Sequence, residues 1–212
     1  MCTLFNQKDM RLAYKVAEHD FVLNIGEKEE VVGQLTQYEP FRIEETAAVE
    51  SVFVMDVVED SVFPKTEGYQ EELFQDDEGT QISAGHINGQ PYFEFYYFRE
   101  LAARMLVNER YDHAVVALQG KQLFGLNNAI MIMYTIATAD KQTMLFHSSV
   151  VMYEGKAYMF LGKSGTGKST HSRLWLKYIP GTELMNDVNP VVRGLYCYGS
   201  PWSGKTPCYK NT

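Results

Sequence analysis

The feature that most constrains this chain is a glycine-rich segment at residues 162–169, Gly-Lys-Ser-Gly-Thr-Gly-Lys-Ser. It fits the pattern G-x-x-x-x-G-K-[ST] at every fixed position. An apolar run at residues 157–161 precedes it, and a helix-like run at residues 170–178 follows it. A phosphate-binding loop needs this order of strand, loop and helix, because backbone amides must converge on an anion at a helix N-terminus. The sequence therefore predicts a P-loop (Walker A motif).

Each residue type in this loop has a chemical role. Glycines adopt backbone conformations closed to residues with a β-carbon, so that successive N–H groups point inward. Lys168 can reach the β- and γ-phosphates of a nucleotide, and the Ser169 hydroxyl can bind the magnesium ion that bridges them. We therefore expect ATP and Mg²⁺ as ligands. The residues expected to bind the nucleotide are Gly162, Lys163, Ser164, Gly165, Thr166, Gly167, Lys168, Ser169 and Thr170.

A carboxylate follows the loop after a helix and a short strand. Residues 182–187 read as this strand, which ends in Asp187. Phosphoryl transfer needs a carboxylate near the magnesium ion, so Asp187 is a candidate metal ligand and, with Lys168, a candidate catalytic residue. An exposed aspartate in the turn that follows is the alternative interpretation of the same residue.

The first 120 residues show the alternation of apolar and polar side chains that is typical of β-strands. Asn88-Gly89 favours a tight hairpin turn, because both residues tolerate positive φ angles. Residues 63–80 are rich in acidic residues and turn formers, and we expect a solvated loop there. Strands are expected at residues 11–16, 21–25, 51–58, 81–87, 91–98, 102–108 and 113–118.

Helical and strand patterns alternate in the rest of the chain. Apolar residues at helical spacing over residues 130–137 predict a helix with Asn127 or Asn128 as its N-cap. Strands are expected at residues 144–152 and 157–161, joined by a turn.

These patterns predict two domains. A β-rich N-terminal domain is expected at residues 1–120, and a P-loop ATP-binding domain at residues 121–212. The expected fold class is α/β, or α+β over the whole chain.

The segment Phe-His-Ser-Ser-Val at residues 146–150, the P-loop and the acidic turn at Asp187 resemble the HPr kinase and phosphoenolpyruvate carboxykinase superfamily. Within it, they are most similar to the HPr-kinase-like ATPases of unassigned substrate. The resemblance covers residues 142–212 and implies a nucleotide-binding domain of this type. It also implies that His147 binds the catalytic metal together with Asp187 and Ser169. In the kinase branch, an aspartate of the acidic turn is the general base.

The chain departs from this pattern at the acidic turn, where the family has two aspartates and this chain has Asn186-Asp187-Val188. In one register Val188 replaces a metal ligand. In the other register Asn186 replaces the base with an amide, which cannot take a proton at neutral pH.

Two functions therefore remain open. The first is an ATP-dependent kinase of the HPr-kinase-like group, with a protein or a small molecule as phosphate acceptor. The second is a catalytically impaired nucleotide-binding module or switch. Phosphoenolpyruvate carboxykinase activity is disfavoured, because Arg173 and Arg193 are the only arginines after Arg110 to clamp two carboxylates.

The last segment has two interpretations of equal weight. Small residues surround one tryptophan and one lysine there, which fits a substrate loop as well as a turn-rich connection. The chain stops at Thr212, so we expect a parallel sheet short of strands and a domain incomplete at its C-terminus, as a fragment or a natural truncation. The candidate substrate-loop residues are Ser200, Trp202, Ser203 and Lys205.

Charge and composition limit the partners and the compartment. A net charge of −8 argues against a nucleic-acid binder, which needs clustered lysine and arginine. The N-terminus lacks the apolar core of a secretory signal, and the longest apolar stretch, at residues 129–139, is too short to span a bilayer. The 3 cysteines have no metal-ligand spacing and fit reduced thiols. We expect a cytoplasmic protein that binds neither nucleic acid nor membranes.

Overall fold

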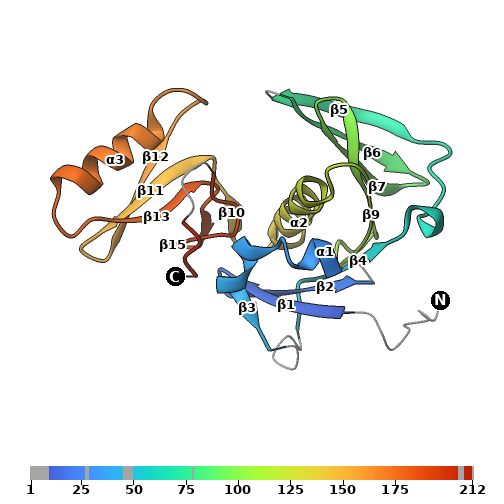
Figure 1. The fold of residues 1–212 in the computed structure, drawn as a ribbon, viewed down its shortest axis with the longest axis horizontal. Helices are drawn as coiled ribbons and strands as arrows, with labels where there is room; N and C mark the ends of the chain where they lie inside the picture. Colours follow the sequence, from blue (N-terminus) through green and yellow to red (C-terminus); the bar gives the residue numbers. More distant parts are fainter. Residues whose placement is uncertain (1–9, 27–28, 45–49, 78, 205–207, 212) are drawn as a thin grey trace. The chain divides into compact units, whose positions relative to one another are not determined.

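The computed structural model describes residues 10–26, 29–44, 50–77, 79–204 and 208–211. The chain divides into two compact units, and Figure 1 shows its elements coloured along the sequence. The first unit comprises Met1–Ala13, Asp20–Thr36 and Ile43–Ala137, and the second comprises Tyr14–His19, Gln37–Arg42 and Thr138–Thr212.

The largest sheet has nine strands, and every strand expected in the first part of the chain is confirmed. The strands are β1 (Met10–Val16), β2 (His19–Ile25), β3 (Arg42–Ile43), β4 (Phe53–Val58), β5 (Gln70–Asp77), β6 (Thr80–Ile87), β7 (Gln90–Tyr97), β8 (Glu100–Val107) and β9 (His113–Leu118). Their order is β3-β1-β2-β4-β9-β8-β7-β6-β5. The sheet is mixed, because β4 pairs in parallel with β2 and β9 whereas the strands from β9 to β5 pair antiparallel.

The hairpin between β6 and β7 forms as expected, with φ angles of 51° at Asn88 and 81° at Gly89. The loop expected at residues 63–80 is wrong in its second half, which forms the edge strand β5. Acidic side chains of β5 bond across to polar side chains of β6: Glu71 accepts from Ser83, Asp76 accepts from Gln81, and Glu72 lies 2.9 Å from His86 Nδ1.

The described segments contain the helices α1 (Glu29–Val32), α2 (Gln122–Thr138) and α3 (Lys168–Tyr178), with 3-10 turns at Thr36–Phe41 and Asp60–Val62. Helix α2 begins earlier than expected, so Asn128 lies inside it and bonds the Phe124 carbonyl at 2.9 Å instead of capping it. A β-carbon on Gly125 would lie 2.5 Å from the Ala102 carbonyl oxygen, which shows how closely α2 approaches β8 at this point. No helix in the described ranges is long and apolar enough to cross a membrane.

The second unit contains two sheets of three strands, β10-β14-β15 and β12-β11-β13. The strand expected at residues 144–152 is divided at Phe146 and His147 into β10 and β11, which belong to different sheets. The strands are β10 (Thr143–Leu145), β11 (Ser148–Tyr153), β12 (Lys156–Leu161), β13 (Glu183–Val188), β14 (Val191–Arg193) and β15 (Tyr196–Tyr198).

The expected α/β fold class, with its P-loop domain of the HPr kinase and carboxykinase type, is wrong. Strands make up 46% of the structure and helices 21%, and a mixed nine-stranded sheet dominates it. The sheet beside the P-loop is antiparallel, not parallel, because a two-residue turn at Glu154 and Gly155 joins β11 to β12 as a hairpin. The strand and helix around the loop were predicted correctly, and the short turn expected between residues 152 and 157 already required an antiparallel pair.

A partly buried ion pair in the first unit makes stability depend on pH. His113 Nε2 lies 2.9 Å from Asp56 Oδ2, and Asn24 donates to Asp56 Oδ1 at 2.6 Å. Burial opposes ionisation of Asp56, but the hydrogen bonds from His113 and Asn24 outweigh it and lower its pKa. The hydrogen bond to Asp56 raises the pKa of His113 above its ordinary value of 6.5.

The pair should therefore stabilise the fold most at mildly acidic pH. The contribution of His113 is complete below pH 6.5 and is lost as the pH rises through its raised pKa. The contribution of Asp56 is lost only in acid, as the pH falls through its lowered pKa. In urea unfolding, the free energy of unfolding of wild type should exceed that of His113→Gln by up to about 1 kcal/mol at about pH 5.5 and by less at about pH 9. An equal difference at both pH values would contradict this account.

Candidate phosphate-binding site

Three segments with candidate residues meet at one edge of the β12-β11-β13 sheet. The P-loop leaves the end of β12, Asp187 lies at the end of β13, and His147 precedes the start of β11. The register confirms the arrangement, because Ser148 pairs with both Leu161 and Val188. Helix α3 connects β12 to β13 and lies along the three strands (Figure 1).

The P-loop turns through glycine conformations into the N-terminus of α3. Gly165 has a φ of 78°, and Gly167, the N-cap of α3, has a φ of 93°, values that a residue with a β-carbon rarely adopts. The Thr166 hydroxyl donates to the Lys163 carbonyl at 2.8 Å and closes the loop. The first N–H groups of an α-helix have no partner within it, so this turn presents donors and partial positive charge to an anion.

The ammonium group of Lys168 is held at the loop by three acceptors. Its Nζ lies 2.8 Å from the Gly162 carbonyl oxygen, 3.0 Å from that of Lys163 and 3.0 Å from His147 Nε2. Since an ammonium only donates, Nε2 of His147 accepts through its lone pair. The structure thus brings His147 to the P-loop lysine, whereas the family resemblance implies a metal ligand.

Asp187 is 4% exposed and lies on the face of the sheet that α3 covers. It pairs in register with Ser149, and residues directly opposite each other in antiparallel strands share a face. The Ser149 hydroxyl lies 2.6 Å from that of Ser172 on α3, which identifies this face. Asp187 therefore faces the helix that begins with Lys168 and Ser169.

These groups line one cavity of about 590 Å³, a volume within the usual range for small-molecule sites. Gly162, Lys163 and Thr166 do not line it and instead hold Lys168 or close the loop. The lining residues are His147, Ser148, Ser164, Gly165, Gly167, Lys168, Ser169, Thr170, Arg173, Asp187, Val188 and Gly204.

The donor atoms of this cavity fit a magnesium ion. The Ser169 hydroxyl and the Asp187 carboxylate are hard oxygen ligands, and magnesium in phosphate sites uses one or two such groups with water and phosphate oxygens. Within the described ranges, no three His, Cys, Asp or Glu side chains gather as a metal-binding group. Ser169 and Asp187 would therefore hold the ion together with the bound phosphates.

The three residues of the acidic turn, Asn186, Asp187 and Val188, have different surroundings. Asn186 is fully buried, and its Nδ2 donates to the Ser200 hydroxyl at 3.1 Å while its Oδ1 accepts from the backbone N–H of Val188 and Asn189 at 3.2 and 3.0 Å. Both ends of this amide are used within the fold. Val188 lines the cavity with an apolar side chain. Among the described residues that line the cavity, Asp187 carries the single carboxylate.

The candidate substrate-loop residues pack within the second unit. Ser200 and Trp202 are buried, and the Trp202 indole N–H donates to the Tyr38 hydroxyl at 2.9 Å. Ser203 Oγ accepts from the backbone N–H of Asp187 at 3.3 Å. None of these three lines the cavity, and Lys205 lies outside the described residues.

Four lining residues were not among the predicted site residues: Ser148, Arg173, Val188 and Gly204. Arg173 follows Ser169 by four residues on α3, so helical spacing alone could have placed both side chains on one face. Ser148 has no such signal, because a serine at a strand end is common in any β-protein.

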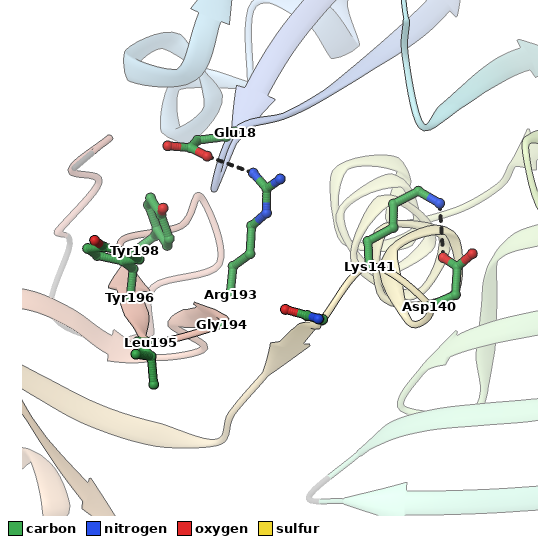
Figure 2. A pocket seen from close by; sticks show the side chains of 9 residues that line it. Glu18, Asp140, Lys141, Arg193, Gly194, Leu195, Tyr196 and Tyr198 are labelled. Carbon is green, nitrogen blue, oxygen red and sulfur yellow. Dashed lines mark hydrogen bonds and ion pairs between the residues drawn. The ribbon is translucent and has the colours of Figure 1, made fainter.

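A second cavity, of about 820 Å³, lies elsewhere in the second unit (Figure 2). Its charged groups neutralise one another: Arg193 Nη1 donates to Glu18 at 2.8 Å, and Lys141 Nζ donates to Asp140 at 2.9 Å. A ligand would have to compete with these ion pairs, so we assign no chemistry to this cavity.

Comparisons with known proteins leave the function to be argued from the site itself, since a fold alone does not imply one. No protein-family model, no curated protein and no solved structure matches the chain.

Proposed function

We propose that this protein binds ATP with Mg²⁺ at the P-loop and transfers its terminal phosphate to an acceptor, a protein or a small molecule. The observation that carries the proposal is the convergence of Lys168, Ser169 and Asp187 on one cavity at the N-terminus of α3. The three groups come from the first turn of α3 and from the strand β13 that follows it, and they supply the positive charge, hydroxyl and carboxylate that phosphoryl transfer uses. We expect this activity in the cytoplasm.

Each group has a distinct task in this proposal. The backbone N–H groups of the loop and Lys168 bind the phosphate oxygens, and a magnesium ion held by Ser169 and Asp187 would supply positive charge at the terminal phosphates. Asp187 orients the ion with Ser169. A carboxylate that binds the ion is a poor proton acceptor, because the neighbouring positive charge favours its ionised form. Since the cavity offers a single carboxylate among the described residues, we expect slow transfer.

A catalytically impaired nucleotide-binding module is the second candidate. Two observations favour it. Both ends of the Asn186 amide form hydrogen bonds within the fold, and Val188 presents an apolar side chain to the cavity. Both proposals share nucleotide binding and differ only in turnover.

Replacing Val188 with aspartate should raise magnesium-dependent ATP turnover by about tenfold. The change adds a second carboxylate to the cavity, which strengthens the hold on the ion and frees Asp187 to act on the acceptor, a gain of about 1.4 kcal/mol in the barrier. Phosphate release from ATP, measured with and without magnesium, reports the effect.

The matched control is Val188→Asn, because asparagine has nearly the same size as aspartate and carries no charge. It should leave turnover at the wild-type rate. Equal rates for wild type and Val188→Asp would contradict the idea that Val188 occupies the place of a missing ligand. Equal gains in both variants would assign the effect to shape and not to charge.

A further inference from the structure

Ser148 carries a buried hydroxyl that no described part of the fold satisfies. The residue is 0% exposed, and its Oγ has no hydrogen-bond partner among the residues that the structure describes. Its cross-strand neighbours, Leu161 and Val188, share its face of the sheet and are apolar. Buried hydroxyls almost always find a partner, because leaving one unpaired loses its hydration without compensation.

The next residue, Ser149, provides an internal comparison. It is equally buried, and its hydroxyl pairs with that of Ser172 on α3 at 2.6 Å. Side chains alternate between the faces of a strand, so the two serines point to opposite sides of β11. One serine joins the sheet to its helix, while the other lines the cavity at the P-loop.

The place of Ser148 indicates its ligand. It begins the central strand of the sheet, between Leu161, the last strand residue before the P-loop, and Val188, the neighbour of Asp187. The metal ion that Asp187 would hold bridges the β- and γ-phosphates of a nucleotide. A hydroxyl at the strand end next to Val188 therefore reaches the terminal phosphate more readily than the innermost one.

We infer that Ser148 is a further ligand-binding residue, whose hydroxyl donates a hydrogen bond to the terminal phosphate of bound ATP. This inference rests on the proposed function. It accounts for a polar side chain at a fully buried position between apolar neighbours, because the bound phosphate would complete the hydrogen bonding of the hydroxyl.

The test compares Ser148→Ala with Ser149→Ala in the full chain. Ser148→Ala should weaken ATP binding about tenfold in the presence of magnesium, leave ADP binding unchanged, and not lower the thermal unfolding midpoint. Ser149→Ala should lower that midpoint, because it leaves Ser172 without its partner, and should bind ATP as wild type does. This opposite pattern separates a ligand contact from a contact that only maintains the fold.

Each other outcome is decisive. If wild type binds ATP and Ser148→Ala binds it equally well, the hydroxyl does not contact the nucleotide and the inference is overturned. Equal losses of ATP and ADP affinity overturn the assignment to the terminal phosphate. If folded wild type binds neither nucleotide, the proposed function itself fails, and this inference fails with it.

Discussion

Replacing Lys168 with alanine is expected to lower the affinity of the protein for ATP by about 100-fold. The ammonium group is held at the cavity by two loop carbonyls and His147, and phosphate oxygens of bound ATP would replace two of these acceptors through charge-assisted hydrogen bonds. Such bonds stabilise by about 1.5–3 kcal/mol each, so losing two removes about 3 kcal/mol, or about two powers of ten in affinity. Calorimetric titration with ATP measures the loss directly.

Lys163→Ala is the matched control. It removes the same charge from the same loop, but Lys163 contributes to the site through its backbone carbonyl, which alanine retains. Its side chain does not line the cavity, so ATP affinity should fall by less than about threefold, by loss of screened surface charge. Similar losses in both variants would mean that only net charge matters and that the motif has been misread.

Replacing Trp202 with alanine should destabilise the fold by about 3–5 kcal/mol without a specific effect on nucleotide affinity. The side chain is 3% exposed, its ring packs edge-on against Tyr38 with centroids 6.4 Å apart, and its N–H bonds the Tyr38 hydroxyl. Burial holds the pKa of Tyr38 well above its usual range, so that hydroxyl remains protonated throughout the test. Urea unfolding, followed by circular dichroism, reports the loss.

Trp175→Ala is the comparison, because Trp175 is the other tryptophan and packs on the half-buried surface of α3 against Tyr158, with ring centroids 4.8 Å apart. It should cost less than about half as much, since less of its surface is buried. A stable Trp202→Ala variant that fails only in phosphate transfer would support the substrate-loop interpretation instead.

The fold could be predicted from sequence where local pattern decides it. Alternation and the Asn88-Gly89 turn gave β6 and β7 correctly, and apolar spacing gave α2. Strand β5 was missed because an exposed edge strand has no buried face, so Glu71, Glu72 and Asp76 resemble a loop. The α/β class was wrong because strands outnumber helices and a mixed nine-stranded sheet dominates the structure.

The candidate site shows the same division. The P-loop and its strand and helix follow from consecutive residues, and the register brings Asp187 to them. The orientation of Asn186 could not be predicted, because its partner Ser200 comes from a separate segment. The contact between His147 and Lys168 likewise depends on the switch of the chain from one sheet to another at β11.

The most direct test of the account is calorimetric titration of the 212-residue chain with ATP, with and without magnesium. The account predicts binding in both conditions and tighter binding with magnesium, because Ser169 and Asp187 line the same cavity as Lys168. A folded sample that binds no ATP in either condition would contradict the central claim.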